Sequence, residues 1–205
     1  MRVLVVDNSG GRGPYTSRLI RCLRADAVVT EAEFRKTDVR SFDLLVLSGS
    51  DQTFSEGTVT SEALRVNYLA MTSGVPVLGI CFGMQVMAVL RGGIVRRCPG
   101  ARKGWKRLPH ATAPATPPSA PLLPPLSSLL LPCFRSQRAY FDHKDCILRA
   151  PPSFLGLRDK EGLLLMMQST DRRFMGVQFH PEMSRFDVSK WLDSGGRFRA
   201  LQPSV

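Results

Sequence analysis

The 205-residue sequence has few cysteines and histidines, and those it has are unevenly spaced. Its five cysteines are odd in number and form no Cys-x-x-Cys pair, which argues against a disulfide framework and against a zinc ribbon. The three histidines lie at irregular spacing, which argues against a histidine-rich metal site. We therefore expect a reducing, cytoplasmic setting and neither a metal nor another cofactor.

Long hydrophobic runs are also missing, and no segment is long and apolar enough to cross a membrane. Residues 1–7 lack the charged leader and small-residue cleavage site of a signal peptide, so we expect them to form a strand. With 43% hydrophobic residues, the chain has the composition of an ordinary globular protein, for which one domain is the default at this length.

Negative charge is scarce: the formal net charge is +11 and the pI is about 10.1. A basic surface favours the approach of anions, including nucleotides, nucleic acid and acidic proteins. The basic clusters carry few interleaved aromatic residues, so we expect a solvated or partner-facing surface and not nucleic-acid binding. The clusters comprise Arg96, Arg97, Arg102, Lys103, Lys106 and Arg107, and separately Arg172 and Arg173.

Strand-like and helix-like segments alternate along the chain. Short apolar runs predict strands, whereas apolar residues at helical spacing predict the helices between them. This alternation indicates an α/β fold with a doubly wound, mostly parallel sheet flanked by helices, whose ligand site lies off the carboxyl ends of the strands. The strands are expected at 2–7, 43–47, 75–80, 139–141, 162–168 and 174–179, and the helices at 15–23, 60–71, 84–90 and 184–192. A further short apolar stretch lies at 27–29.

A proline-rich segment interrupts this pattern. Eight prolines lie between residues 109 and 132, where they prevent a regular helix or a central strand. The spacing of some prolines matches polyproline ligands, but such matches are common by chance and an insertion is the simpler interpretation. We therefore predict a single domain over 1–193 with an insertion at about 109–132, followed by a flexible tail at 194–205.

The segment Gly79-Ile80-Cys81-Phe82-Gly83 has the pattern of a nucleophile elbow. A sharp strand-to-helix turn strains the backbone of the nucleophile, and flanking glycines remove Cβ atoms that would collide. Cys81 would then lie at the amino end of a helix, which favours a thiolate, with the Phe82 amide directed at a reacting carbonyl. The alternative is that Cys81 is only a small buried residue at a strand end.

The segment Gln178-Phe179-His180-Pro181-Glu182 supplies what a catalytic thiol needs. Such a thiol requires a base within hydrogen-bond reach, and the base requires a third group that fixes its tautomer. Alternation along an extended chain places His180 and Glu182 on the same side, and Pro181 stiffens the link between them. Taken alone, His180 is equally compatible with a core or surface histidine.

Together these two motifs resemble the class I, or triad, glutamine amidotransferases, whose patterns are Gly-Ile-Cys-x-Gly-x-Gln and Phe-His-Pro-Glu. The resemblance implies a flavodoxin-like fold in which Cys81 attacks the amide carbon of glutamine and a γ-glutamyl thioester is hydrolysed. It further implies that His180 protonates the departing ammonia while Glu182 orients and stabilises His180. Gln85 matches the position that contacts glutamine.

The loop after the expected strand at 43–47 matches the one that supplies the second oxyanion amide, here from Gly49 and Ser50. The family usually has Ser-Gly-Gly-Pro where this chain has Ser48-Gly49-Ser50-Asp51. Ser50 therefore carries a side chain where the family has a glycine. Asp51 brings negative charge toward a site that must stabilise an oxyanion. An ordinary tight turn is the alternative for this loop, as a helix-surface amide is for Gln85.

A further stretch, from Phe141 to Asp145 and then from Ala150 to Phe154, is similar to the His-x-Asp and Leu-Pro-x-Phe region of GMP synthetase glutaminase domains. His143 would then help to shape the glutamine pocket. A surface histidine in a charged turn is the competing interpretation.

Family members of this type normally pass ammonia to a synthetase domain, and 205 residues leave no room for one. The resemblance therefore implies glutamine as substrate and, as partner, a separate synthetase subunit. Two alternatives stay open, because one scaffold hosts several chemistries. The chain is a stand-alone glutaminase or γ-glutamyl hydrolase in one, and a non-catalytic binding or regulatory relative in the other.

Overall fold

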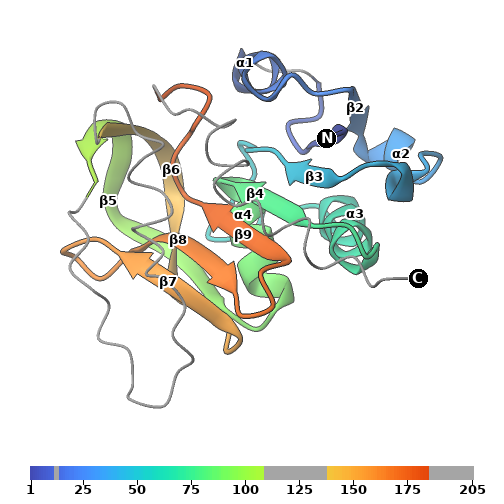
Figure 1. Ribbon diagram of the computed structural model, residues 1–205. Coiled ribbons are helices and arrows are strands. Elements are labelled where there is room, and N and C mark those ends of the chain that lie inside the picture. Colours follow the sequence, from blue (N-terminus) through green and yellow to red (C-terminus); the bar gives the residue numbers. More distant parts are fainter. Residues whose placement is uncertain (12–13, 109–137, 185–205) are drawn as a thin grey trace.

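The computed structural model describes residues 1–11, 14–108 and 138–184 (Figure 1). The predicted insertion at 109–132 and tail at 194–205 lie outside the described residues, as does the predicted helix at 184–192 except for its first residue. The extent of the domain, 1–193, therefore stays a prediction.

The central sheet has seven strands among the described residues (Figure 1). Its first five strands run parallel, whereas β8 is antiparallel to both of its neighbours. The prediction of a mostly parallel sheet is confirmed. In spatial order the strands are β2 (Ala27–Thr30), β1 (Val3–Asp7), β3 (Leu44–Leu47), β4 (Val77–Ile80), β9 (Phe174–Val177), β8 (Leu164–Ser169) and β7 (Phe154–Arg158).

Helices cover both faces of this sheet, because successive residues of a buried strand point to opposite sides. In β1, Val3 and Val5 belong to the core that also holds Leu19 of α1, whereas Leu4 and Val6 belong to the core beneath α3 and α4. The arrangement is thus doubly wound, as predicted. The helices are α1 (Pro14–Leu23), α2 (Glu31–Phe34), α3 (Ser61–Thr72) and α4 (Phe82–Leu90), with a 3-10 helix at Val39–Ser41.

A second, two-stranded antiparallel sheet consists of β5 (Ile94–Arg107) and β6 (Arg138–Arg149). The sequence predicted only residues 139–141 of this sheet, and it also missed β7. The reason is that β5 carries most of the basic clusters and no alternating apolar pattern, since it forms an outlying ribbon and not a core strand. Its register also shifts between Arg97 and Arg102, which obscures any period of two.

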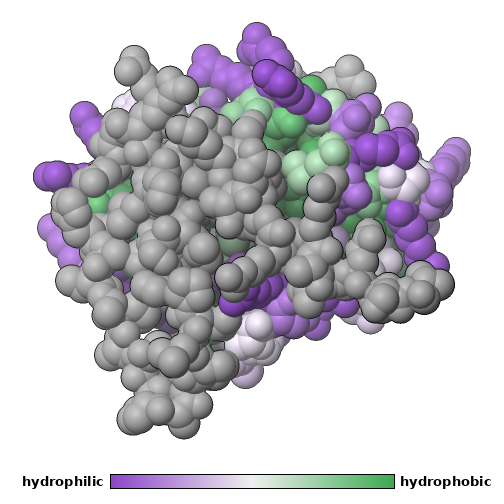
Figure 2. All heavy atoms as spheres, in the orientation of Figure 1, coloured by the Kyte–Doolittle hydropathy of each residue, from purple (hydrophilic) through white to green (hydrophobic). Residues whose placement is uncertain are grey.

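On the face shown in Figure 2, most of the described residues along the rim of the view are hydrophilic, and hydrophobic residues are visible in a smaller area toward the top. None of the described helices is long and apolar enough to cross a membrane.

Helix α4 packs unusually close to the sheet at Gly83. A Cβ atom on this residue would collide with the carbonyl oxygen of Leu47 and would lie 2.8 Å from the Leu47 Cβ. Because Leu47 is the last residue of β3, this contact fixes the distance between the amino end of α4 and the edge of the sheet.

We expect Gly83→Ala to lower the free energy of unfolding by about 1–3 kcal/mol, because overpacking forces the helix away from β3. Urea denaturation followed by circular dichroism measures the change. Gly100→Ala is the matched control, since a Cβ at Gly100 meets no atom within 4 Å. Equal stability of the two variants would show that the close approach is not required.

Candidate active site

Three neighbouring parallel strands end at one edge of the sheet, and the candidate residues follow them directly. Gly49 comes two residues after β3, Cys81 follows β4, and His180 comes three residues after β9. Because β3, β4 and β9 run parallel as neighbours, their carboxyl ends meet. The structure therefore brings these three residues together at the edge that the sequence predicted.

Cys81 has the backbone conformation of a nucleophile elbow. Its φ of 51° and ψ of −106° lie in a region that side-chain-bearing residues rarely occupy. Hydrogen bonds hold this conformation on both sides: the Cys81 amide donates to Val177 O at 2.8 Å, and Cys81 O accepts from the Gln85 amide at 3.1 Å. The turn thus places the thiol at the amino end of α4.

Three glycines around this turn have close neighbours, and at Gly79 and Gly83 a side chain would collide with backbone atoms. A Cβ on Gly79 would lie 2.7 Å from the backbone of Gly83, so this flanking glycine removes a Cβ atom that would collide, as the sequence predicted. A Cβ on Gly49 would lie 3.2 Å from His180 Cε1 and 3.7 Å from Cys81 Cβ. The loop after β3 therefore lies directly against the thiol and the imidazole.

His180 and Glu182 form a buried pair, with 2.7 Å between Nδ1 and Oε1. Their side chains are only 4% and 2% exposed. The other ring nitrogen, Nε2, is buried and makes no hydrogen bond within the described residues. This leaves Nε2 as the atom that exchanges protons with a reacting group, while Glu182 fixes the tautomer.

The electrostatics of the site favour a charged imidazole. Burial opposes the charge, yet the charges of Cys81 and Glu182 outweigh it and raise the pKa of His180 far above its usual range. A protonated His180 in turn stabilises a thiolate at Cys81, and so does the amino end of α4. The arrangement therefore offers a nucleophile beside a proton donor.

Two further groups contact the thiol. Cys81 Sγ lies 3.7 Å from Asp142 O and 3.7 Å from Gln178 Nε2. Gln85 donates from Nε2 to Asp145 O at 2.9 Å and to Gln178 Oε1 at 3.3 Å. Gln85 thus holds Gln178 against the thiol in this structure, and its contact with a bound glutamine stays a prediction.

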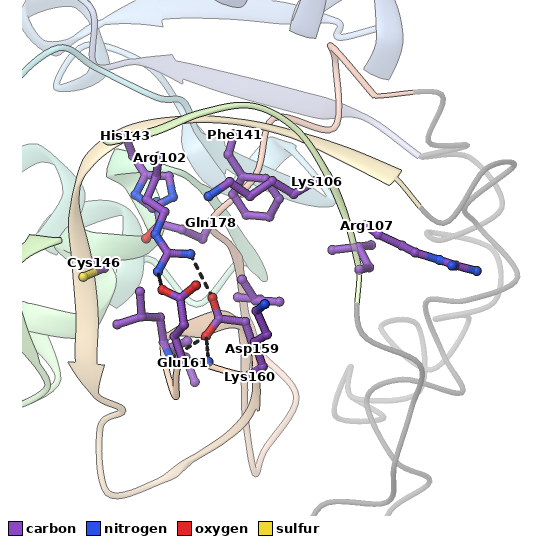
Figure 3. Close-up of a pocket in the computed structure, with 14 residues that line it drawn as sticks. Arg102, Lys106, Arg107, Phe141, His143, Cys146, Asp159, Lys160, Glu161 and Gln178 are labelled. Atoms are coloured by element: carbon purple, nitrogen blue, oxygen red, sulfur yellow. Dashed lines mark hydrogen bonds and ion pairs between the residues drawn. The ribbon is translucent and has the colours of Figure 1, made fainter. Parts of the chain in front are cut away.

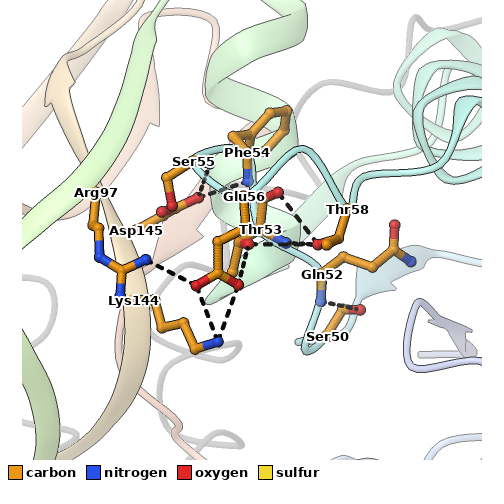
Figure 4. Close-up of polar contacts among 10 residues, drawn as sticks. All are labelled: Ser50, Gln52, Thr53, Phe54, Ser55, Glu56, Thr58, Arg97, Lys144 and Asp145. Carbon is orange, nitrogen blue, oxygen red and sulfur yellow. Dashed lines mark hydrogen bonds and ion pairs between the residues drawn. The ribbon is translucent and has the colours of Figure 1, made fainter.

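The loop that follows Gly49 is anchored to β6 through Asp145 (Figure 4). One carboxylate oxygen of Asp145 accepts hydrogen bonds from the amides of Phe54 and Ser55, at 2.6 and 3.0 Å. At the start of the loop, the Ser50 hydroxyl accepts from the Gln52 amide at 3.2 Å. The Ser50 side chain, which replaces the usual glycine, is therefore engaged within its own loop.

The outer part of the same loop is held by Glu56, which bridges the two strands of the ribbon (Figure 4). Its carboxylate lies 2.8 Å from Arg97 of β5 and 3.1 Å from Lys144 of β6. Arg97 and then Lys144 lower the pKa of Glu56 to about 2. Both basic side chains are more than half exposed, so each pair contributes little alone, but together they tie the loop to the ribbon.

His143 lies on the wall of a separate pocket of about 420 Å³ (Figure 3). Its Nδ1 is 2.7 Å from Asp145 O and 3.5 Å from Cys98 Sγ. Burial lowers the pKa of His143 to about 4, so the ring is neutral at physiological pH. A role for His143 in shaping the glutamine site stays a prediction.

The same pocket is lined by apolar residues and by one ionic cluster (Figure 3). Arg102 pairs with Asp159 at 3.0 Å and also with Glu161. Gln178 lines this pocket and also contacts Cys81, so it connects the pocket wall with the thiol.

Comparison with known proteins identifies the family. The model of the family "Glutamine amidotransferase class-I" matches residues 4–187. The chain therefore belongs to the class I glutamine amidotransferases, as the elbow and Phe-His-Pro-Glu motifs predicted.

Among named relatives, the chain is similar to GMP synthase [glutamine-hydrolyzing] of Aliivibrio fischeri, with 29% identity over 189 residues. That match covers 89% of this chain and 33% of the relative. GMP synthase [glutamine-hydrolyzing] of Yersinia pestis is also 29% identical, over 193 residues, which is 34% of its length. The chain thus spans about a third of the length of these relatives.

Solved structures confirm the fold. A protein from Thermoplasma acidophilum described as one subunit of a GMP synthase superposes with a TM-score of 0.68 at 21% identity, covering 100% of this chain and 98% of that chain. A glutamine amidotransferase from Thermotoga maritima superposes with a TM-score of 0.60 at 15% identity, covering 99% and 86%.

Sequence reasoning did not single out Tyr15 and Asp142, which lie close to the candidate triad. The Tyr15 ring stacks on His180, and the main-chain oxygen of Asp142 contacts the thiol. The position of Tyr15 in the sequence could have indicated its place near the site. It lies shortly after the carboxyl end of β1, and in such sheets the ligand-site residues follow the carboxyl ends of the strands.

We expect Glu182→Gln to slow the alkylation of Cys81 by iodoacetamide at pH 7 by about tenfold or more, because losing the carboxylate lowers the pKa of His180 and weakens support for the thiolate. Peptide mass mapping follows the adduct on Cys81. Glu62→Gln, which breaks a surface pair with Arg35, is the control; equal rates in both variants at pH 7 would contradict the assignment.

Proposed function

We propose that this protein hydrolyses the side-chain amide of glutamine to glutamate and ammonia. The observation that carries the proposal is the buried Nδ1–Oε1 pair of His180 and Glu182, which leaves Nε2 for a proton transfer beside a thiol at a helix terminus. This is the arrangement that a cysteine nucleophile with a supporting base requires.

In the first half of the reaction, the Cys81 thiolate attacks the amide carbon and forms a C–S bond. His180 gives its proton from Nε2 to the departing nitrogen, the C–N bond breaks, and ammonia leaves. In the second half, His180 takes a proton from water, whose oxygen attacks the thioester. The C–S bond breaks, glutamate leaves, and the thiolate is restored. Glu182 keeps the imidazole oriented in both halves and stabilises its charge whenever Nε2 carries a proton.

Two amides are proposed to stabilise the oxyanion that forms on the glutamine carbonyl. Phe82 is the first residue of α4, so its amide belongs to the unpaired donors at the helix start. The second donor comes from Gly49 and Ser50, in the loop that lies against Cys81 and His180. The engagement of the Ser50 hydroxyl with Gln52 supports this role, since it directs that side chain into its own loop.

We further propose that the ammonia passes to a separate synthetase. Similarity to relatives named as glutamine-hydrolysing GMP synthases supports a synthetase as the acceptor of the ammonia. The acceptor would then be a nucleotide bound by the synthetase. A stand-alone γ-glutamyl hydrolase and a non-catalytic regulatory relative are the alternatives that the two experiments below separate.

We expect a diazo-ketone analogue of glutamine to form one covalent adduct, on Cys81, that excess glutamine suppresses. Intact mass spectrometry with peptide mapping detects it. Cys81→Ala should show no adduct, whereas Cys22→Ala, which changes a half-buried cysteine of α1, should behave as wild type. An adduct that glutamine does not suppress would contradict the glutamine site and favour the regulatory relative.

We expect the rate of glutamate release to rise at least tenfold when a GMP synthetase is added with its nucleotide substrates. The reason is that binding of the synthetase would close the glutamine site and complete the catalytic arrangement. A coupled glutamate dehydrogenase assay measures this rate. Cys81→Ala supplies the background. High activity without the synthetase, and no stimulation by it, would favour the stand-alone hydrolase.

A further inference from the structure

The imidazole of His180 is enclosed by two aromatic rings that the proposed reaction does not use. The Tyr15 ring stacks on its face, with centroids 4.6 Å apart and planes inclined by 29°. The Tyr140 ring meets it edge-on, with centroids 6.5 Å apart. Gly49 lies against Cε1. These neighbours surround the ring while Nε2 stays available for proton transfer.

Tyr15 is itself fixed by a polar anchor across the site. Its hydroxyl donates to Asp142 Oδ2 at 2.8 Å, and Lys103 Nζ lies 3.1 Å from the same oxygen. Burial and the neighbouring carboxylate raise the pKa of Tyr15, so the hydroxyl keeps its proton. Burial disfavours the charge of Asp142, but Tyr15 and Lys103 overcome it and lower the pKa of this carboxyl. The hydrogen bond therefore joins a neutral phenol to a carboxylate.

Asp142 also connects this anchor to the nucleophile, because its main-chain oxygen is the one that lies 3.7 Å from Cys81 Sγ. One residue of β6 therefore contacts the thiol through its backbone and, through its side chain, holds the ring that covers the imidazole. A short path from α1 to the thiol thus runs through Tyr15 and Asp142.

His180 needs such support because a single hydrogen bond does not fix a ring. The contact from Nδ1 to Glu182 sets the position of one atom, but it leaves the imidazole free to tilt about that atom. Tilting displaces Nε2, and proton transfer to a leaving nitrogen is sensitive to displacements of an ångström or less. A flat ring stacked at 4.6 Å opposes this tilt.

We infer that Tyr15 is a positioning residue that holds the plane of His180 through ring stacking and is itself held by Asp142. This inference rests on the proposed glutaminase activity for its kinetic consequence. The structural part, an imidazole ordered by a stacked ring, is measurable without any turnover.

The test compares Tyr15→Phe with Tyr15→Leu. Phenylalanine keeps the flat ring and loses only the hydroxyl, whereas leucine keeps much apolar volume and loses the flat face. We expect Tyr15→Phe to retain kcat within about threefold, and Tyr15→Leu to lose roughly tenfold to a hundredfold in kcat with KM nearly unchanged. The matched controls are Tyr68→Phe and Tyr68→Leu, at an exposed tyrosine of α3.

A role in folding alone would give a different pattern. The loss of activity in each Tyr15 variant would then follow the fall in its melting temperature. Equal kcat values for Tyr15→Phe and Tyr15→Leu, at equal stability of the two variants, would overturn the inference. The alkylation of Cys81 by iodoacetamide gives a second readout. It should stay near the wild-type rate in Tyr15→Leu, because Glu182 still keeps His180 charged.

The inference stays testable if the wild type shows no glutaminase activity, an outcome that would contradict the proposed function alone. Relaxation of a ¹³C label at Cε1 of His180 then reports the order of the ring. We expect a rigid ring in the wild type and in Tyr15→Phe, and a clearly lower order parameter in Tyr15→Leu. An equally rigid ring in Tyr15→Leu would show that the stacking does not position His180.

Discussion

The strained turn at Cys81 is the constraint on which the rest of the site depends. A side-chain-bearing residue with φ of 51° persists only where its surroundings fix it, and here the amide to Val177 and the carbonyl to Gln85 do so. The turn joins a buried parallel strand to the close-packed start of α4. The sheet, the glycine contacts and the start of the helix therefore all fix the position of the thiol. Because β9 pairs with β4, the same sheet brings His180 to the thiol.

Much of this was readable from the sequence, because the strongest signals are local. Continuous apolar runs indicated the parallel strands, and the small residues around Cys81 follow from contacts that leave no space for a Cβ. His180 and Glu182 were predictable as a pair because a spacing of two residues suffices for their contact. The family match over residues 4–187 agrees with these predictions.

The parts that were missed depend on contacts between distant segments. The basic strand β5 has no apolar period, and its pairing with β6 joins residues separated by the proline-rich segment. Tyr15 and Asp142 are 127 residues apart, so neither residue alone indicates the hydrogen bond that links them. The motif predicts that Gln85 contacts the substrate, and this stays a prediction; the hydrogen bonds from its amide nitrogen to Asp145 and Gln178 were not predictable, because these residues lie 60 and 93 positions away.

The central claim is that a thiol placed by this turn forms a thioester with the γ-glutamyl group of glutamine. Rapid acid quenching of the protein during turnover with glutamine, followed by intact mass spectrometry, tests it most directly. We expect a γ-glutamyl adduct that maps to Cys81, disappears as glutamine is exhausted, and is absent from Cys81→Ala. Release of glutamate and ammonia at an undiminished rate by Cys81→Ala would contradict it.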